Sequence, residues 1–208
     1  MNNTTKGGLL GGGGGAALGA LAGYLIGKDA KGAAIGAAVG GAVGTGAGVI
    51  IGKKMDKAKA AAEAVKNAQV QSIQDANGLQ AVQVTFDSGI LFDTNKADLK
   101  QASKNELSQF AAKMQDMEDT DITIFGHTDN TGTYEVNQKV SNNRADAVEK
   151  YLKKCGIATS RMTAQGLAYD FPIADNETVE GRAQNRRVEI YITANEEMIE
   201  AANNGTLE

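Results

Sequence analysis

Residues 126–145 read GHTDNTGTYEVNQKVSNNRA, and this stretch decides what kind of domain the chain forms. It begins at the end of an alternating strand pattern, in which Ile122 and Ile124 share one face, and it ends inside a helix. Asp129 lies in the turn between the strand and the helix, and Arg144 follows 15 residues later. The stretch therefore places an acidic turn residue and a basic helix residue close together in the chain.

Polar side chains of this helix share one face. Asn137 and Arg144 are seven residues apart, which at about 100° per residue leaves only about 20° between them around the axis. Ser141 belongs to the same face. An apolar stripe runs beside it: Val136, Val140, Ala147 and Tyr151. The patch suits a ligand that carries an ammonium and a carboxylate together, with Asp129 for the cation and Arg144 holding the carboxylate in bidentate fashion.

These residues also carry a resemblance to a known family, the OmpA C-terminal (OmpA-like) peptidoglycan-binding domain, which includes peptidoglycan-associated lipoproteins and MotB-type motor proteins. The matching motifs stand in the family's order: GHTDNTG at 126–132, Asn137, Ser141, Arg144 with Ala145, PIADN at 172–176, and GRAQNRRVEI at 181–190. Val140 stands where the family usually has Leu, and this apolar exchange affects no functional group.

The resemblance implies a ligand and its contacts. Asp129 and Arg144 would hold the diaminopimelate side group of the peptidoglycan stem peptide, and Asn137 and Thr128 would add hydrogen bonds. An FDTN run matches the other wall of the pocket: Phe92, Asp93, Thr94 and Asn95. Asp93 has an alternative role as an anion near the start of the following helix. Taken singly, Asp129 is typical of a turn and Arg144 of a solvated helix, so their joint placement carries the binding hypothesis.

The C-terminal part of the chain reads as a mixed α/β domain. Strands are predicted at 82–86, 122–127, 162–169 and 188–192, and helices at 96–117, 134–154 and 178–185. Asn95 and Asp98 are predicted to cap the first of these helices. The order β-α-β-α-β-α-β predicts a two-layer α/β sandwich, which the resemblance also implies. We expect this domain at 79–194, followed at 195–208 by an acidic tail in a frayed helix.

The first 52 residues hold 18 of the 26 glycines. Glycine recurs every fourth residue from position 7 to 27 and again from 32 to 52, on either side of a polar turn at 28–31. In water the 12 stripe glycines would cost a helix on the order of 10 kcal/mol, whereas in lipid such glycine zippers let helices approach closely. The uncharged segments 8–27 and 33–52 are each about 30 Å long as helices, enough to span a bilayer.

Residues 1–52 are therefore predicted to form a helical hairpin that enters the membrane through positions 7–52, with a flexible Gly/Ala-rich spacer as the alternative. Oligomeric packing would strengthen such a hairpin, so a homo-oligomer is one expected state. Residues 53–78, rich in Ala, Lys and Glu, are predicted to be a solvated helical linker that ends at Asn77-Gly78. No convincing signal peptide stands within residues 1–27, so an export signal is expected upstream, and a lipid-anchor cysteine before Met1 is left open.

Charge and composition exclude several functions. From Ala81 onward the chain carries 13 basic and 21 acidic residues, a net charge of −8, and nucleic acid demands the opposite sign. With one histidine and one cysteine, no metal site or cofactor is predicted, and no nucleophile stands beside a base. Arg182, Arg186 and Arg187 are predicted to pair with acidic groups of the domain, and His127 to hydrogen-bond locally.

The predicted function is a non-enzymatic tether between the outer membrane and the cell wall, with the C-terminal domain in the periplasm. One alternative is a MotB-like stator subunit, which would need a carboxylate within a hydrophobic span; Asp29 lies instead in the polar turn. A cell-wall hydrolase is the other alternative. It would need a pair of carboxylates flanking a sugar bond, and no sequence feature selects such a pair.

Overall fold

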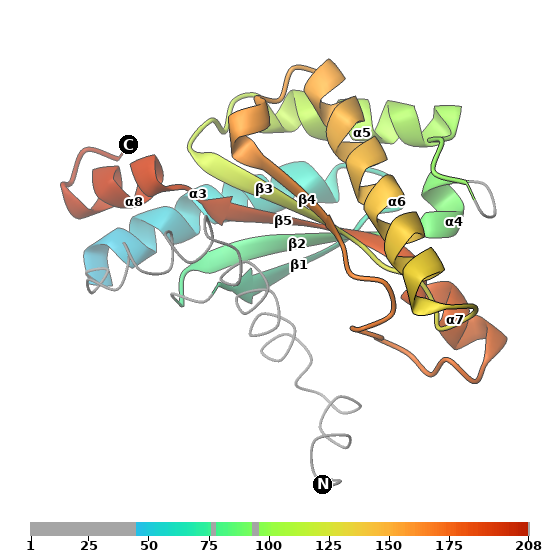
Figure 1. Ribbon diagram of the computed structural model, residues 1–208. Coiled ribbons are helices and arrows are strands. Elements are labelled where there is room, and N and C mark those ends of the chain that lie inside the picture. The colour runs from blue at the N-terminus through green and yellow to red at the C-terminus, as the bar shows by residue number, and fades with distance from the viewer. Residues whose placement is uncertain (1–44, 76–77, 93–95, 208) are drawn as a thin grey trace, which may run out of the picture.

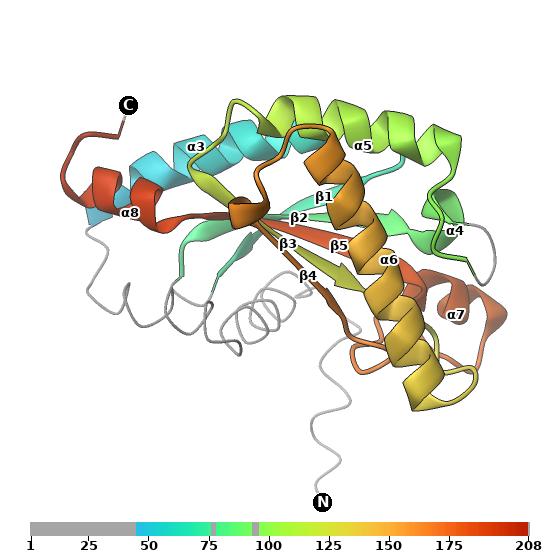
Figure 2. The same ribbon diagram turned by 45° about the horizontal axis from the view of Figure 1, so that its top comes forward.

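The computed structural model describes residues 45–75, 78–92 and 96–207. Within these residues, a five-stranded sheet carries a layer of helices on one face (Figures 1 and 2). The predicted two-layer α/β sandwich is confirmed by this arrangement. The glycine-zipper hairpin predicted for residues 1–52 lies outside the described residues, except for positions 45–52.

The last strand of the sequence lies in the centre of the sheet. The strands are β1 (Gln69–Gln74), β2 (Gln80–Asp87), β3 (Thr120–Gly126), β4 (Met162–Gly166) and β5 (Arg187–Ala194). Their order is β1-β2-β5-β3-β4, and only the β3–β4 pair is parallel. In the β3–β5 ladder Gly126 lies opposite Val188, so the loop that follows β3 comes next to the residues that precede β5. This pairing brings the predicted site turn to the arginine cluster.

The helices cover the face of the sheet that is uniformly apolar. They are α3 (Thr45–Glu63), α4 (Ser88–Leu91), α5 (Gln101–Met114), α6 (Tyr134–Lys154) and α8 (Glu196–Asn203). The helix α7 (Val179–Asn185) lies beyond the end of the sheet (Figure 1), and a 3₁₀ turn at Thr159–Arg161 precedes β4. Alternate residues of the central strands pack against Leu107, Phe110, Val148 and Leu152 of α5 and α6. α6 has the predicted bounds, because the Thr133 hydroxyl caps it by accepting from the Val136 backbone nitrogen.

The prediction of a solvated linker over residues 53–78 is wrong. α3 continues to Glu63 as one of the helices that cover the sheet, and β1 follows it as an edge strand paired with β2. One side of α3 is fully buried in the core: Ile51, Met55, Ala58 and Ala62. The buried face of this segment was not recognised from the sequence, because alanine is common in solvated helices as well as on this buried face.

α3 also changes the predicted membrane segment. It begins at Thr45, within the second zipper series, and Ala47 and Ile51 are buried in the domain core. Gly52 lies close to Gln80 of β2, with 3.3 Å between the position of an added Cβ and the amide oxygen. The last eight residues of the predicted span 33–52 therefore belong to the folded domain. No helix of the described residues is long and apolar enough to cross a membrane.

Smaller differences concern helix ends. α5 begins at Gln101 rather than at residue 96, and its N-cap, Lys100, makes no side-chain capping bond, so the predicted Asn95–Asp98 cap is wrong. The short helix α4 within the predicted loop was missed; Asp87 caps it by accepting from the Gly89 backbone nitrogen. The C-terminal helix α8 is docked rather than frayed, because Met198, Ile199 and Ala202 are buried in the core.

α6 lies unusually close to the sheet where β3 and β4 end. Gly126 and Gly166 face each other in the β3–β4 ladder, and a Cβ on either would collide with the backbone of α6 at Ser141. Hydrogen bonds lock this contact: the Gly166 backbone nitrogen donates to Asn142 Oδ1 at 2.7 Å, and Gln138 Nε2 donates to the Gly166 carbonyl oxygen at 2.7 Å. The two glycines thereby fix the height and rotation of α6 over the sheet.

Replacement of Gly166 by alanine is expected to lower the free energy of unfolding by about 2 kcal/mol or more, because α6 must move to admit the methyl group. Gly48 in α3 is the matched control, since a Cβ there meets no atom within 4 Å. Gly48→Ala should be neutral or stabilise by up to about 1 kcal/mol. Urea unfolding of both variants and the parent measures the difference, and equal stabilities of the two variants would contradict the close-packing argument.

Candidate functional site

Asp129 lies in the loop between β3 and α6 and is held from two sides. Its Oδ1 accepts from the Thr131 backbone nitrogen at 2.9 Å, and its Oδ2 accepts from Arg186 Nη1 at 2.6 Å. Burial raises the pKa of this carboxyl group, but the hydrogen bonds from Arg186 and Thr131 outweigh it, so the pKa lies below its ordinary value. Asp129 is therefore an anion at neutral pH, and it already has one cationic partner.

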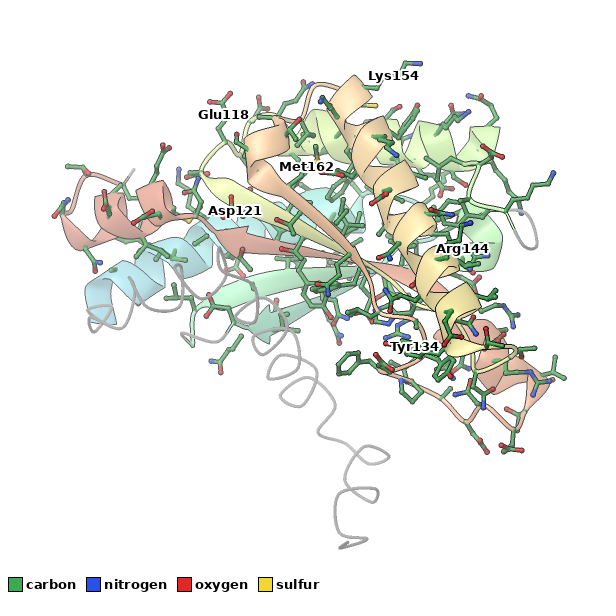
Figure 3. The ribbon with its side chains drawn as sticks, viewed as in Figure 1. Glu118, Asp121, Tyr134, Arg144, Lys154 and Met162 are labelled. Atoms are coloured by element: carbon green, nitrogen blue, oxygen red, sulfur yellow. The ribbon has the colours of Figure 1, made fainter. Side chains whose placement is uncertain are left out.

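Arg144 projects from α6 on the side where α4 lies (Figure 3). Its side chain stacks on Phe92, with the guanidinium carbon 5.4 Å from the ring centroid, and Nε donates to the Lys96 carbonyl oxygen at 3.3 Å. Burial and the nearby charge of Arg186 lower the pKa of Arg144, and the charge of Asp129 opposes this effect. An arginine nevertheless stays charged in proteins. Arg144 is only 5% exposed.

The two terminal nitrogens of the Arg144 guanidinium make no hydrogen bond to the described residues, where Nε alone donates. These two nitrogens form the end of the planar fork that pairs with a carboxylate. Neither nitrogen is among the buried polar atoms that lack a partner, so both reach solvent. The fork is therefore accessible to a carboxylate ligand.

The structure brings together some of the predicted site residues. The ring of Phe92 contacts Arg144, in agreement with the predicted pocket between the FDTN run and α6. Asp93, Thr94 and Asn95 lie outside the described residues. Asn137 uses its amide nitrogen on the loop itself, donating to the carbonyl oxygens of Thr131 and Thr133 at 2.9 and 3.0 Å. Asn137 thus shapes the turn that carries Asp129, and its contact with a ligand stays a prediction.

Thr128 has a buried hydroxyl without a partner in the described part of the chain. Its backbone nitrogen donates to the Ala168 carbonyl oxygen at 2.8 Å, which ties the site loop to the loop after β4. Ala168 has a φ of 44°, a left-handed conformation that costs a residue with a side chain about 1 kcal/mol or more. The Ala168 backbone nitrogen donates to Ser141 Oγ at 3.0 Å, so the contact with α6 maintains this strained turn.

A buried polar network lies behind the site, on the opposite face of β5. Arg187 Nε donates to Glu189 Oε1 at 2.6 Å, and the Tyr191 hydroxyl donates to Glu189 Oε2 at 2.6 Å. Arg187 also donates to the Phe171 carbonyl oxygen at 3.0 Å. Sequence reasoning missed Glu189 and Tyr191, although their spacing of two from Arg187 was a signal that all three share one face of a strand.

The three clustered arginines, Arg182, Arg186 and Arg187, make different contacts. Arg186 pairs with Asp129 and Arg187 with Glu189, which confirms the predicted pairing for these two residues. Arg182 instead donates to the Asn176 carbonyl oxygen at 2.8 Å. For His127, the side-chain contact within the described residues is the one between Nε2 and Glu189 Oε2, at 3.5 Å.

No group of three or more His, Cys, Asp and Glu side chains that could hold a metal ion occurs among the described residues. Arg186 is paired with Asp129, and Arg144, on which the Asp129 charge also acts, has two terminal nitrogens without a partner among the described residues. The arrangement can bind a carboxylate, and beside it an ammonium, because a carboxylate such as Asp129 accepts more than the two hydrogen bonds it already receives.

Comparison with known proteins shows which family this domain resembles. Residues 91–186 match the model of the OmpA family, and residues 6–59 match the glycine zipper. Residues 91–186 therefore form an OmpA-family domain, preceded by a glycine-zipper region, as the sequence resemblance predicted.

Relatives among curated proteins agree with this assignment. Outer membrane protein Omp38 of Acinetobacter baumannii is 41% identical over 111 residues, which cover 53% of this chain and 31% of the relative. Peptidoglycan-binding protein ArfA of Mycobacterium bovis is 39% identical over 112 residues, covering 54% of this chain and 34% of the relative. The match thus spans about a third of these two relatives.

Solved structures show the same fold. A cell wall anchor of the T6SS from Pseudomonas aeruginosa superposes with a TM-score of 0.56 and 28% identity, covering 68% of this chain and 97% of that one. A putative MotB-like protein from Desulfovibrio vulgaris gives a TM-score of 0.57 at 24% identity, covering 72% and 92%. The second likeness is evidence for the fold alone.

Stability is expected to fall as the pH drops below about 6.5. Burial, followed by the charge of Arg187, lowers the pKa of His127 below its ordinary value of 6.5, despite the opposing effect of Glu189. Below that pH, His127 binds a proton more readily in the unfolded chain than in the folded one. The free energy of unfolding therefore decreases as the pH falls, by up to about 1.4 kcal/mol per pH unit.

Glu189 adds a second loss at lower pH. Burial opposes its ionisation, but contacts with His127, Arg187 and Tyr191 hold its pKa far below the ordinary value of 4.5, so its stabilising effect is lost as the pH falls below 4.5. Urea unfolding at about pH 7.5 and about pH 5.5 isolates His127. His127→Gln should flatten the change between these two pH values, and an unchanged slope in the variant would contradict this assignment.

Proposed function

We propose that this chain is a non-enzymatic anchor that binds peptidoglycan through the domain containing residues 91–186. Support comes from the family match and from relatives whose own names describe a peptidoglycan-binding protein and a cell wall anchor. The observation that carries the proposal is the guanidinium fork of Arg144, whose two terminal nitrogens have no partner among the described residues and which lies within electrostatic reach of the ionised Asp129. The names of these relatives denote binding and anchoring, and the site has the donors of a binding site rather than a nucleophile and its base.

The ligand group we propose is the side group of diaminopimelate in the stem peptide. It carries an ammonium and a carboxylate on one carbon, so a single group presents both charges at fixed separation. Arg144 would take the carboxylate through its two terminal nitrogens, and Asp129 the ammonium through lone pairs that Arg186 and Thr131 leave unused. Phe92 would contact the methylene chain of the ligand, because its ring forms the apolar wall beside Arg144.

The remaining contacts follow from the same placement. The buried Thr128 hydroxyl has no partner in the described residues and would donate or accept one hydrogen bond on ligand binding. Asp93, Thr94 and Asn95 directly follow Phe92 in the chain, and we propose that they also contact the ligand. Asn137 would act chiefly by holding the turn, since its amide nitrogen is occupied there.

Substitution at the site should weaken binding while the fold stays intact. Hydrogen bonds to charged groups contribute roughly 1.5–3 kcal/mol, so Asp129→Ala and Arg144→Ala should each weaken binding to a diaminopimelate stem peptide by about tenfold to a hundredfold. Arg144→Lys should recover only part of the affinity, because it keeps the charge but loses the fork. Calorimetry with the peptide, and sedimentation with purified sacculi, measure the two effects.

The matched control is Lys154→Ala, which removes an exposed cation at the far end of α6 (Figure 3) and should leave binding unchanged. A peptide with lysine in place of diaminopimelate supplies the control on the ligand side. It keeps the ammonium but offers no side-chain carboxylate, so the parent protein should discriminate against it and Arg144→Ala should not. Equal affinities of the parent protein for both peptides would rule out Arg144 as the group that binds this carboxylate.

For the N-terminal region we propose attachment to the outer membrane, which would leave the C-terminal domain in the periplasm. Because positions 45–52 belong to α3, the second zipper segment keeps only residues 33–44, about 18 Å as a helix, short of the roughly 30 Å hydrocarbon core. We therefore assign the attachment to the first segment, residues 8–27, with association between copies as its means of packing glycine stripes.

Charged substitutions distinguish the two segments. Leu21→Asp should release most of the chain from the membrane fraction, because an aspartate at the centre of a span costs about 3 kcal/mol. Ala38→Asp is the matched control in the shorter segment and should release much less. Fractionation of cells that express each full-length variant provides the measurement. Recovery of the parent chain entirely in the soluble fraction would refute membrane attachment.

A further inference from the structure

The strand β1 forms one edge of the sheet (Figures 1 and 2). Within the described residues it pairs on one side only, with β2. Residues of an antiparallel strand direct their backbone N–H and C=O groups alternately toward one neighbour and toward the other side. The Asp75 nitrogen donates to the Leu79 carbonyl oxygen at 2.9 Å, which fixes the phase of this alternation. The residues that direct their backbone groups away from β2 are therefore Val70, Ser72 and Gln74.

This edge lacks the usual protection against pairing with another chain. The outward backbone groups of β1 make no hydrogen bond to other described residues. The strand reads QVQSIQ, without a charged residue, proline or glycine, whereas natural edge strands usually carry a charge or a proline that prevents further pairing. At the opposite edge of the sheet, α6 side chains bind both the N–H and the C=O of Gly166 at the end of β4. β1 is therefore the edge that can accept a further strand.

The outward groups of β1 are complementary to those of a second β1. Two identical strands that pair antiparallel about a twofold axis make reciprocal contacts. With Ser72 opposite Ser72 of the second copy, Val70 lies opposite Gln74, so all three outward residues meet an outward residue. Each such pair exchanges two backbone hydrogen bonds. In a register centred on Gln71, Gln74 would instead lie opposite Ala68, which precedes the strand.

We propose that β1 is an interface between two copies of this chain, in which the two β1 strands pair antiparallel with Ser72 opposite Ser72. The pairing joins the two sheets into one continuous sheet. It brings no like charges together, because β1 carries none. This interface belongs to the folded domain and is separate from any association through the glycine stripes.

The antiparallel arrangement determines where the two candidate sites lie. In each copy the site is at the end of the sheet where β1 begins, because Gly126 and Phe86 both pair with Val188, and Gln69 pairs with Thr85. Antiparallel pairing of the β1 strands therefore places the two sites at opposite ends of the joined sheet. On the proposed function, one dimer would bind two separate stem peptides, which increases its avidity for the cell wall.

A position-specific disulfide tests the interface in the full-length chain. Cα atoms of a hydrogen-bonded antiparallel pair are about 5.5 Å apart, within the range that a disulfide bridges. With Cys155→Ser in the background, Ser72→Cys should form a covalent dimer on mild oxidation, measured by non-reducing electrophoresis. Ser160→Cys, at another exposed position, is the matched control and should remain largely monomeric. Equal dimer yields at the two positions would overturn the proposal.

Substitutions at Ser72 test the same pairing without a covalent bond. Ser72→Pro removes an outward N–H that β2 does not use, and should weaken dimerisation roughly tenfold or more. Ser72→Lys and Ser72→Glu each place like charges opposite one another and should weaken it several-fold. An equimolar mixture of these two variants should recover the association, because opposite charges then meet.

Sedimentation velocity of the full-length variants in detergent measures these changes, and circular dichroism verifies the fold of each. Ser160→Lys is the matched control for added charge and should dimerise as the parent does. A parent chain that stays monomeric at every concentration would overturn the proposal. Dimerisation that is unchanged by all three substitutions at Ser72 would overturn it equally.

Discussion

The close approach of α6 to the ends of β3 and β4 is the constraint on which the site depends. Gly126 and Gly166 lie side by side in the sheet and admit the backbone of α6 at Ser141, where any side chain would push the helix away. Arg144 follows Ser141 by less than one turn, so the height of the helix over the sheet sets where its guanidinium lies. A displacement of about 1 Å at this contact would move the fork relative to Asp129.

The site joins elements that are far apart in sequence, and the central place of β5 makes this possible. Antiparallel pairing of β3 with β5 brings the Asp129 loop against the residues that precede Arg187, and the same strand carries the buried Arg187–Glu189–Tyr191 network behind the site. Arg187 also donates to the Phe171 carbonyl oxygen, whereas its neighbour Arg186 pairs with Asp129. The two neighbouring arginines thus stabilise different parts of the domain.

The pairing of Asp129 with Arg186 alters how a zwitterionic ligand would be recognised. One carboxylate beside one guanidinium would match the ammonium and the carboxylate of the ligand group, respectively. Because the Arg186 guanidinium is already bound to Asp129, a ligand ammonium would share that carboxylate with a cation of the protein. This sharing would reduce the affinity of Asp129 for the ammonium relative to an unpaired carboxylate.

The sequence by itself determined the family of residues 91–186, the α/β class, the full extent of α6 and the nearness of Asp129 to Arg144, because these rest on local periodicity, capping and a motif of fixed spacing. It did not determine that α3 and β1 belong to the domain, since an alanine-rich stripe is recognised as buried only when its partner surface is known. Nor did it determine which arginine of the cluster meets Asp129. That contact spans 57 residues and depends on the register of β5 against β3, which only the assembled sheet decides.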